Sequence, residues 1–401
     1  MKTRILVLLA FAFFLMTISR CKQLYNPPAL EANLGYLVVD GAIIAGDSTI
    51  INLSRTQNLT DSTYINNPET GAQVSIIGQN AESYNLIEEN RGKYVVANIG
   101  LNFGELYRLK IITNNGKQYL SDPVPLKQTP AIDSITWDTA NNLFVQVNLN
   151  THDPQNNTRY YRWQYSETWQ FNSQIDSHLI NDNGVLRMRT PFEDVHTCWN
   201  SANSTNIIIG TSAKLAQDVI YQQQIVNDSI YISLYPVKHQ LVNPFVSQKF
   251  SIEYSVLIKQ YAMGENEYNF WQNLKQNTEQ LGTIFAPQPG QVTGNVHCQN
   301  NPNEPVLGYV GACSIQEKRI FIKSSDLFPG TVGNPDIGCS KILITPAQIN
   351  QYLGYPTLYT PVDSVFAPGT SVFLGVDFSY SFCADCTQSD GLTNKPAFWP
   401  N

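Results

Sequence analysis

The chain has 401 residues, which is enough for two or three domains that each bury a core of their own. Charged residues make up only 14% of the sequence, and the formal net charge at pH 7 is −7. A net negative chain without basic runs argues against nucleic-acid binding and against electrostatic adhesion to anionic lipid. Aromatic residues reach 11%, and Asn, Gly and Pro recur between short apolar runs, which is typical of a β-rich protein.

The first twenty residues predict an export signal. Lys2 and Arg4 supply a positive start, and the apolar run Ile5–Ile18 follows them. This run is shorter than the roughly 18 residues that a membrane-spanning helix needs, and no stop-transfer pattern comes after it. The sequence therefore predicts that residues 1–20 are a signal peptide and that the chain works outside the cytoplasm.

The signal ends in Ile18-Ser19-Arg20-Cys21, which resembles the lipobox of bacterial lipoproteins, although Arg20 replaces the usual small residue. In a lipobox the cysteine becomes the first residue of the mature chain, and its sulfur carries a diacylglycerol. The resemblance implies lipid attachment at Cys21, which would hold the protein to a membrane. Ordinary secretion, with Cys21 left as a spare thiol, is the alternative. Residues 21–34 contain a Pro-Pro pair and no periodicity, and they predict a short tether.

Residues 35–121 predict a β-sandwich domain. Seven short stretches of alternating or β-branched residues, among them Thr49–Ser54 and Tyr107–Thr113, are separated by turn signals such as Asn114-Asn115-Gly116. Strands at this spacing indicate an immunoglobulin-like or transthyretin-like β-sandwich. The prolines that follow predict a stiff linker over residues 122–135, so the domain boundary is expected there.

Residues 136–401 predict a larger β-rich domain with one long helix. The aromatic stretch Tyr160–Tyr165 predicts a strand whose rings form a core layer, with an exposed stacking platform as the alternative. Residues 264–279 predict the helix, because apolar side chains recur there at spacings of three and four. Trp271 and Leu274 on this stripe are expected to seal the edge of the β core. A helix that faces a partner is the alternative.

The chain contains seven cysteines. Setting Cys21 aside for the lipid leaves an even number, as expected for disulfides in an oxidising compartment. The disulfide candidates are therefore Cys198, Cys298, Cys313, Cys339, Cys383 and Cys386.

The spacing of the cysteines favours some pairs over others. Cys298 and Cys313 flank a turn-rich stretch that a strand follows, and they are the pair expected to bridge neighbours across a hairpin. The motif Cys383-Ala384-Asp385-Cys386 is interpreted as a structural loop, tied to itself, to Cys339 or to Cys198. A redox-active pair and a metal half-site are the alternatives, but neither a second CxxC nor a thioredoxin-like βαβ context accompanies the motif.

No catalytic, metal-binding or cofactor-binding residues are predicted. The sequence has no GxSxG elbow, no HExxH, no phosphate-binding loop and no GxGxxG after a strand. The adjacent acids Glu88-Glu89 and Glu193-Asp194 predict a solvated surface, because carboxylates that hydrolyse glycosides must face each other across a cleft. We therefore expect no enzyme activity and no cofactor. A hydrolase that uses Asp and Glu in a β cleft is the remaining alternative.

Motifs over nearly the whole mature chain together resemble a known family. The most specific match joins Tyr268-Asn269-Phe270-Trp271 to residues 287–290 and to Thr293-Gly294-Asn295-Val296. The other matches are Tyr36–Gly41, Ile51–Thr56, Pro68–Val74, Gly92-Lys93-Tyr94, Tyr160–Trp163, Leu307-Gly308-Tyr309, Cys383–Cys386 and Lys395–Trp399. With these motifs the chain resembles a family of Bacteroidota outer-membrane lipoproteins, domain-of-unknown-function family 4249.

The resemblance implies a place and a partner but no ligand. Members of this family look like companions of TonB-dependent outer-membrane transporters. The chain is therefore expected to be a non-enzymatic, lipid-anchored protein of the outer membrane that faces the cell surface. Its expected function is that of an accessory subunit of a TonB-dependent nutrient transporter, either capturing a ligand or acting as a lid. A structural or adhesive surface lipoprotein that binds a glycan or matrix polymer is the alternative.

Overall fold

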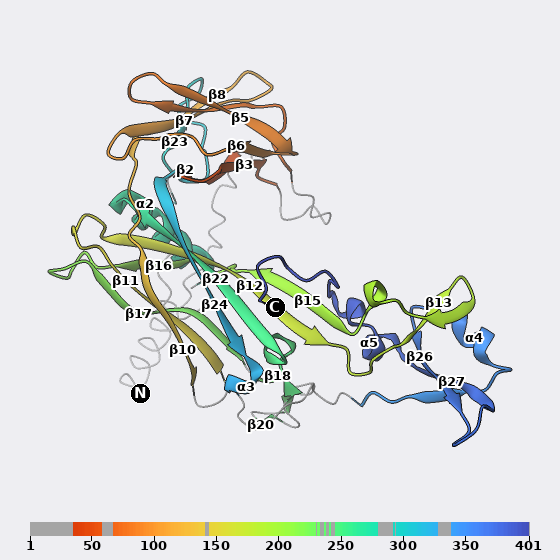
Figure 1. Ribbon diagram of the computed structural model, residues 1–401. Helices are drawn as coiled ribbons and strands as arrows, with labels where there is room; N and C mark the ends of the chain where they lie inside the picture. Colours follow the sequence, from red (N-terminus) through yellow and green to blue (C-terminus); the bar gives the residue numbers. More distant parts are fainter. Residues whose placement is uncertain are drawn as a thin grey trace, which may run out of the picture.

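The computed structural model of the protein describes residues 35–57, 67–140, 144–229, 231–232, 236–237, 240–241, 245–279, 292, 294–327 and 338–400. The described chain is mainly β, with several sheets, which confirms the predicted class (Figure 1). Among these residues no helix is long and apolar enough to cross a membrane. The predicted signal peptide and tether, including Cys21, lie outside the described residues.

A nine-stranded sheet folds around the first core and forms the upper body in Figure 1. Sequence alternation produces its strands: in Thr49–Arg55 (β3), Ile51 and Leu53 are buried while Ile50 and Asn52 are exposed. The other strands are β1 (Leu37–Gly41), β4 (Gln73–Gly78), β5 (Ser83–Asn90), β6 (Lys93–Val96), β7 (Leu106–Ile112), β8 (Gln118–Ser121), β9 (Val124–Pro125) and β23 (Val296–Cys298). Their order is β1-β3-β6-β5-β4-β7-β8-β23, with β9 paired to β7.

The last strand of this sheet comes from a distant part of the chain, residues 294–312, which we call the return segment. Its strand β23 pairs antiparallel with β8, and Leu307 forms a parallel bridge with Val38 of β1. Val306, Val310 and Ala312 are buried in the first core. A domain assigned to residues 35–121 from the sequence therefore omits part of its core. The strand β23 is only three residues long, and nothing in its sequence indicates that it pairs with β8.

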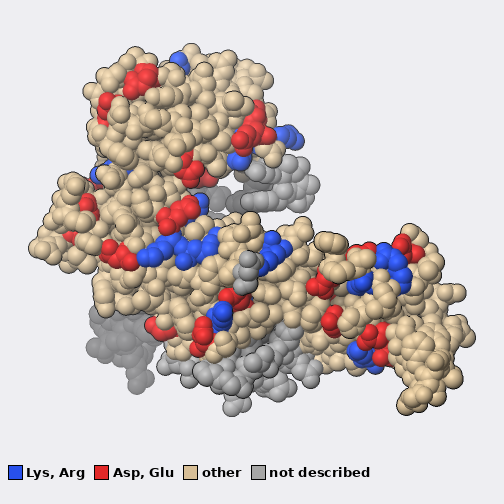
Figure 2. All heavy atoms as spheres, viewed as in Figure 1, with Lys and Arg blue, Asp and Glu red and all other residues tan. Residues whose placement is uncertain are grey.

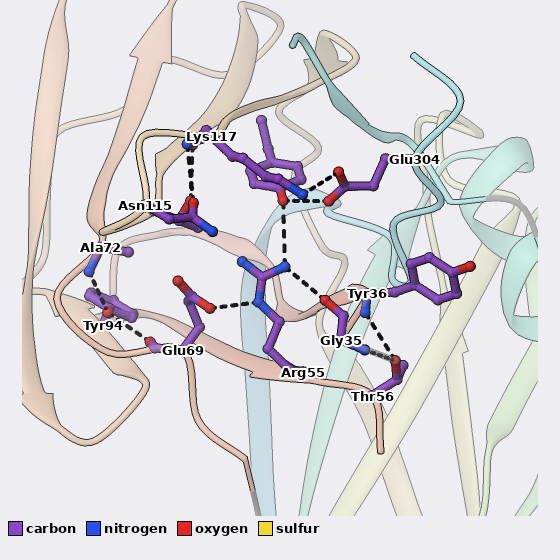
Figure 3. Close-up of polar contacts among 12 residues, drawn as sticks. Gly35, Tyr36, Arg55, Thr56, Glu69, Ala72, Tyr94, Asn115, Lys117 and Glu304 are labelled. Carbon is purple, nitrogen blue, oxygen red and sulfur yellow. Dashed lines mark hydrogen bonds and ion pairs between the residues drawn. The ribbon is translucent and has the colours of Figure 1, made fainter. Parts of the chain in front are cut away.

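A polar network fixes the return segment to the sandwich (Figure 3). The carboxylate of Glu304 accepts a hydrogen bond of 2.7 Å from the Tyr119 hydroxyl and lies 2.6 Å from Lys117 Nζ. Arg55 of β3 donates to the Tyr119 oxygen at 3.5 Å and forms an ion pair of 2.6 Å with Glu69. The network thus connects the return segment to β8 and, through the Tyr119 hydroxyl, to β3.

We expect Glu304→Ala to lower the free energy of unfolding by about 2 kcal/mol, because the buried Tyr119 hydroxyl loses its carboxylate acceptor. Lys117 is 42% exposed, so its ion pair contributes little. Urea unfolding followed by circular dichroism measures the loss. Glu89→Ala, which removes an exposed ion pair with Lys93, is the control and is expected to cost less than about 0.5 kcal/mol. Equal losses in the two variants would contradict the role given to Glu304.

The central body consists of two sheets around a second core (Figure 1). In the aromatic strand Tyr160–Asn172 (β12), Tyr161 and Trp163 are fully buried, and Trp163 Nε1 donates to Gln260 Oε1 at 2.8 Å. The prediction of a core layer is therefore confirmed for these two rings. One sheet has the order β15-β12-β22-β24-β2, with β16 on β12, and the other has the order β10-β11-β17. The bounds are β2 (Ile43–Ala45), β10 (Ile132–Ala140), β11 (Phe144–His152), β15 (Thr197–Asn203), β16 (Ile208–Thr211), β17 (Val219–Ser229), β22 (Glu253–Met263) and β24 (Ala312–Lys323).

A third, smaller body projects to the right in Figure 1, and we call it the C-terminal lobe. Its core is built on Leu179, Ile344, Leu353, Val376 and Phe378. Its elements are β13 (Leu179–Asp182), β14 (Val185–Met188), β25 (Ile342–Ile344), α4 (Ile349–Leu353), β26 (Tyr359–Phe366), β27 (Phe373–Tyr380) and α5 (Ser381–Ala384). The remaining short elements are η1 (Pro191–Glu193), β18 (Tyr231–Ile232), β19 (Pro236–Val237), β20 (Gln240–Leu241), β21 (Phe245–Val246), η2 (Gln248–Phe250), α3 (Ser324–Leu327) and η3 (Cys386–Ser389).

Two disulfides tie the C-terminal lobe. Cys198 of β15 is bonded to Cys386, and Cys339 is bonded to Cys383. The CxxC motif is therefore structural. Its two cysteines are not bonded to each other but to Cys339 and Cys198, which were two of the partners considered from the sequence.

The predicted bridge between Cys298 and Cys313 is wrong. Both thiols are free and buried. The hairpin expected between them does not form, because Cys298 of β23 pairs with β8 in the first core, whereas Cys313 is the second residue of β24 in the central sheet. Closeness in sequence is therefore no guide to cysteine pairing here, since the two cysteines belong to different sheets.

Candidate functional site

A cavity of about 370 Å³ lies where the sandwich meets the long helix α2 (Glu265–Glu279), and we call it the junction cavity. One wall comes from β1, the second from the return segment and the third from α2. The residues that line it are Val38, Val39, Asp40, Phe270, Trp271, Leu274, Val292, Leu307, Gly308 and Tyr309. Asp40 is the only one of these described lining residues with a charged side chain.

The second wall depends on a glycine. Gly308 has φ +120°, and a Cβ there would lie 1.9 Å from the carbonyl oxygen of Val39. This close approach lets the Val39 amide donate to the Leu307 oxygen at 2.8 Å. Asn295 holds the same segment from behind, since its side-chain amide both donates to and accepts from the backbone of Val310, at 3.0 and 2.8 Å. The sequence thus places Leu307 and Tyr309 against β1.

The third wall is the predicted helix, whose position is confirmed. The expectation that Trp271 and Leu274 seal the β core needs correction, because the buried residues of α2 are Glu267 and Phe270. Trp271 and Leu274 are half-buried and line the junction cavity instead. The Phe270 ring lies 5.6 Å from that of Tyr309, so the helix packs on the return segment as well.

Beneath the cavity an arginine connects the helix to the central sheet. The guanidinium carbon of Arg162, on β12, lies 4.5 Å from the centroid of the Trp271 ring and 4.7 Å from that of Tyr261. Cation–π contacts of this kind are stronger when water is excluded. They fix the plane of the Trp271 indole, which is part of the cavity wall.

Glu267 of α2 is an ionisable group that this packing buries. Its carboxyl is buried against Gly311, where an added Cβ would come within 2.3 Å of Oε2. Burial raises the pKa of Glu267 from 4.5 to about 7, although the positive charge of Arg162, the Trp271 indole N–H and the charge of Lys127 all favour the ionised form. A carboxyl with a pKa near neutrality therefore lies on α2, one helical turn before the cavity-lining residues Phe270 and Trp271.

This pKa predicts a pH-dependent stability. The folded protein binds the Glu267 proton more tightly than the unfolded chain does, so stability from this group is present below pH 4.5 and is lost as the pH rises to about 7. We expect Glu267→Gln to match the wild type in acid and to exceed its free energy of unfolding by about 3 kcal/mol above pH 7. Urea unfolding at pH 4.5 and pH 8 measures the difference.

Glu265→Gln is the matched control, because Glu265 lies on the same helix and is exposed. The free energy of unfolding of Glu265→Gln is expected to stay close to that of the wild type at both pH values. A Glu267→Gln variant whose advantage does not grow with pH would contradict the assignment.

The two cysteines of the CxxC motif are each bonded to a distant cysteine, so among the described residues they form neither a redox-active pair nor a metal half-site. Within the described ranges, no group of three or more His, Cys, Asp or Glu side chains is placed to hold a metal ion. Burial raises the pKa of the Cys313 thiol to about 12, and the negative charge of Glu267 acts in the same direction. A thiol held protonated in this way is a poor nucleophile.

In each of the two pairs of adjacent acids, one carboxylate has partners nearby: Glu88 bonds to backbone amides, and Glu193 forms an ion pair with Arg187. The carboxylate of Glu88 accepts from the amides of Gly71 and Gly92, at 2.8 and 2.9 Å. Glu193 is paired with Arg187 at 2.7 Å. Neither acid lines the junction cavity, so the site found here was missed by a search for catalytic motifs. The signal that pointed to it was the apolar stripe of the helix, with Trp271 and Leu274.

Comparison with other proteins gives a family but no activity. No curated protein matches the sequence. Similar solved structures include a two-domain fibronectin type-III segment of chicken tenascin (9% identity, TM-score 0.16, 55% of this chain and 88% of that chain). A second is the FN1–FN3 domains of chicken CNTN1 (11% identity, TM-score 0.15, 57% of this chain and 59% of that chain). A third is the chitinase ChiA74 from Bacillus thuringiensis (10% identity, TM-score 0.15, 44% of this chain and 29% of that chain).

The family is shown by the sequence itself. The profile of one family matches residues 25–319, a range that contains the sandwich, most of the central body, the long helix and the return segment. All the described lining residues of the junction cavity fall inside that range. The chain therefore belongs to the family described as domain of unknown function DUF4249.

Proposed function

We propose that this protein is a non-enzymatic, lipid-anchored accessory protein of the bacterial outer membrane that captures a small apolar ligand for a TonB-dependent transporter. The observation that carries the proposal is the junction cavity, because its volume of about 370 Å³ falls in the range of small-ligand pockets and its walls are mostly apolar. Lipid attachment at Cys21 would keep the body beside the transporter. The immunoglobulin-like or transthyretin-like sandwich would supply one wall of the binding site.

Ligand capture is tested with N-phenyl-1-naphthylamine, an uncharged apolar fluorophore. We expect the protein to bind it, and Leu274→Trp, which fills the junction cavity, to weaken binding by about tenfold or more. Leu215→Trp is the control, because Leu215 is 54% exposed and lies outside the cavity. Equal binding by the two variants would place the probe elsewhere on the protein.

The partner and the location are tested on cells that make the native protein. Purification in mild detergent is expected to recover a second protein of transporter size, and repeated recovery of a lone monomer would argue against a transport role. Labelling of intact cells with an impermeant reagent is expected to reach the protein at the cell surface. Protection of the protein in intact cells, with labelling only after lysis, would place it in the periplasm instead.

A second candidate function is adhesion to a glycan or matrix polymer, and a row of rings on the C-terminal lobe favours it. The ring centroids of Tyr352 and Tyr359 are 4.7 Å apart, those of Tyr359 and Tyr380 5.3 Å, and those of Tyr380 and Phe382 5.7 Å. Tyr355, which is 57% exposed, lines a pocket of about 230 Å³ beside this row. Retarded migration in a polysaccharide gel, lost in Tyr355→Ala, together with normal nutrient uptake in a deletion strain, would favour adhesion over transport.

A further inference from the structure

The hairpin that joins β26 to β27 ends in an exposed apolar tip, residues 366–374, which we call the hairpin tip. The exposed fractions of its large side chains are 51% for Phe366, 60% for Val372, 42% for Phe373 and 39% for Leu374. The rings of Phe366 and Phe373 lie 5.6 Å apart, and these residues are partners across the two strands. The end of this hairpin therefore exposes four large apolar side chains within nine residues, two of them in ring contact.

Several polar groups of the hairpin turn are hydrogen-bonded within the turn. The Ala367 amide donates to the Val372 oxygen at 2.9 Å, and the Thr370 amide donates to the Ala367 oxygen at 3.0 Å. The Thr370 hydroxyl also donates to the Ala367 oxygen, at 3.0 Å, and accepts from the Val372 amide at 3.2 Å. Pro368 has no N–H group to satisfy. The turn can therefore enter an apolar medium at a lower cost in unpaired backbone groups than an open loop would incur.

The hairpin tip also lacks charge. Residues 364–376 contain no Asp, Glu, Lys or Arg. In Figure 2 the protruding lower-right end of the molecule is free of both charge colours, whereas the rest of the C-terminal lobe carries them. The nearest charges in the sequence are Asp363, which is paired with Lys341 at 2.8 Å and with His178 at 2.7 Å, and Asp377. Charged residues thus begin where the two strands enter the lobe.

We infer that the hairpin tip inserts into the surface of a lipid bilayer and forms a second membrane contact. Phe, Val and Leu side chains gain free energy by entering the boundary between headgroups and acyl chains. A stable protein interface usually involves about 20 to 30 residues on each side, far more than four side chains on one narrow turn. Because no basic residue accompanies the tip, insertion depends on apolar contact and not on anionic lipid. The inference stands independently of ligand capture in the junction cavity.

The test uses the full chain with one environment-sensitive fluorophore, attached to Ser371→Cys at the tip or to Asn114→Cys on an exposed turn of the sandwich. Each labelled protein is reconstituted into vesicles of uncharged phosphatidylcholine. Whatever else holds the chain to the vesicle is the same in both proteins. We expect a blue shift and a gain in emission at position 371, none at position 114, and no loss of the shift in high salt.

A second variant separates insertion from misfolding. Phe366→Ser with Phe373→Ser replaces two exposed rings, so the fold is expected to survive, as circular dichroism will check, while the shift at position 371 disappears. The inference is overturned if position 371 shows no shift, or if both label positions shift equally. A shift that appears only when a membrane protein is added to the vesicles would also overturn it, since the partner would then be a protein.

Discussion

Replacing Cys198 and Cys386 together by alanine is expected to lower the free energy of unfolding by about 4 to 5 kcal/mol, because this disulfide closes the longest covalent loop in the described chain. The two cysteines are separated by 188 residues, and both are buried. The bond attaches the end of the C-terminal lobe to β15 of the central sheet. Two backbone hydrogen bonds of 2.8 Å between Trp199 and Leu392 continue the attachment.

The measurement is urea unfolding of both proteins with and without reductant, followed by tryptophan fluorescence. Reductant is expected to lower the midpoint of the wild type strongly and that of the variant by less, because the variant retains only the Cys339–Cys383 bond. Limited proteolysis is expected to release the C-terminal lobe from the variant first. Identical midpoints for wild type and variant under oxidising conditions would show that packing, not the disulfide, holds the lobe to the sheet.

Gly308→Ala is expected to lower the free energy of unfolding by more than about 4 kcal/mol, because backbone strain and a steric clash add at this position. A left-handed φ of +120° is strained for any residue with a Cβ, and the new methyl carbon would lie 1.9 Å from the Val39 carbonyl oxygen. That oxygen belongs to backbone in β1, so it cannot rotate away as a side chain would. Relief requires the return segment to separate from β1, which also removes one wall of the junction cavity.

Gly35→Ala is the matched control for this prediction. Its φ of +112° is nearly the same, but nothing lies within 4 Å of the position that a Cβ would take. Backbone strain alone is therefore expected to lower the free energy of unfolding of Gly35→Ala, by about 1 to 2 kcal/mol. Circular dichroism in urea measures both losses, and N-phenyl-1-naphthylamine binding is expected to fall only in Gly308→Ala. A loss no greater than that of the control would show that the backbone yields more easily than the contact distance implies.

The elements that sequence predicted well are those set by local periodicity. Alternation in Thr49–Arg55 and a spacing of three and four in Glu265–Glu279 each reflect one buried face, so the elements appear where the pattern places them. The aromatic strand is a core strand for the same reason, since Tyr161 and Trp163 point to one side of β12.

The features that sequence could not predict depend on contacts between distant residues. The Cys298–Cys313 bridge was inferred from spacing, but spacing does not report that Cys298 joins β8. Glu267 has the sequence character of a solvated helix residue, but it is buried against Gly311 of the return segment, and Arg162 of β12 acts on its charge. The junction cavity has the same origin, because its walls meet only after the return segment crosses back to β1.

The return segment has a consequence for how the protein matures. Lys117 and Glu304, which bond across the sandwich, are 187 residues apart in sequence. Synthesis from the amino end produces β1 to β8 long before Val296, Val306 and Val310 arrive to complete their core. Until then the unpaired edge of β8 is open to chaperones and to neighbouring chains. Completion of the first body therefore waits until synthesis has passed Ala312, and a chain that ends before Val296 leaves this core unfinished.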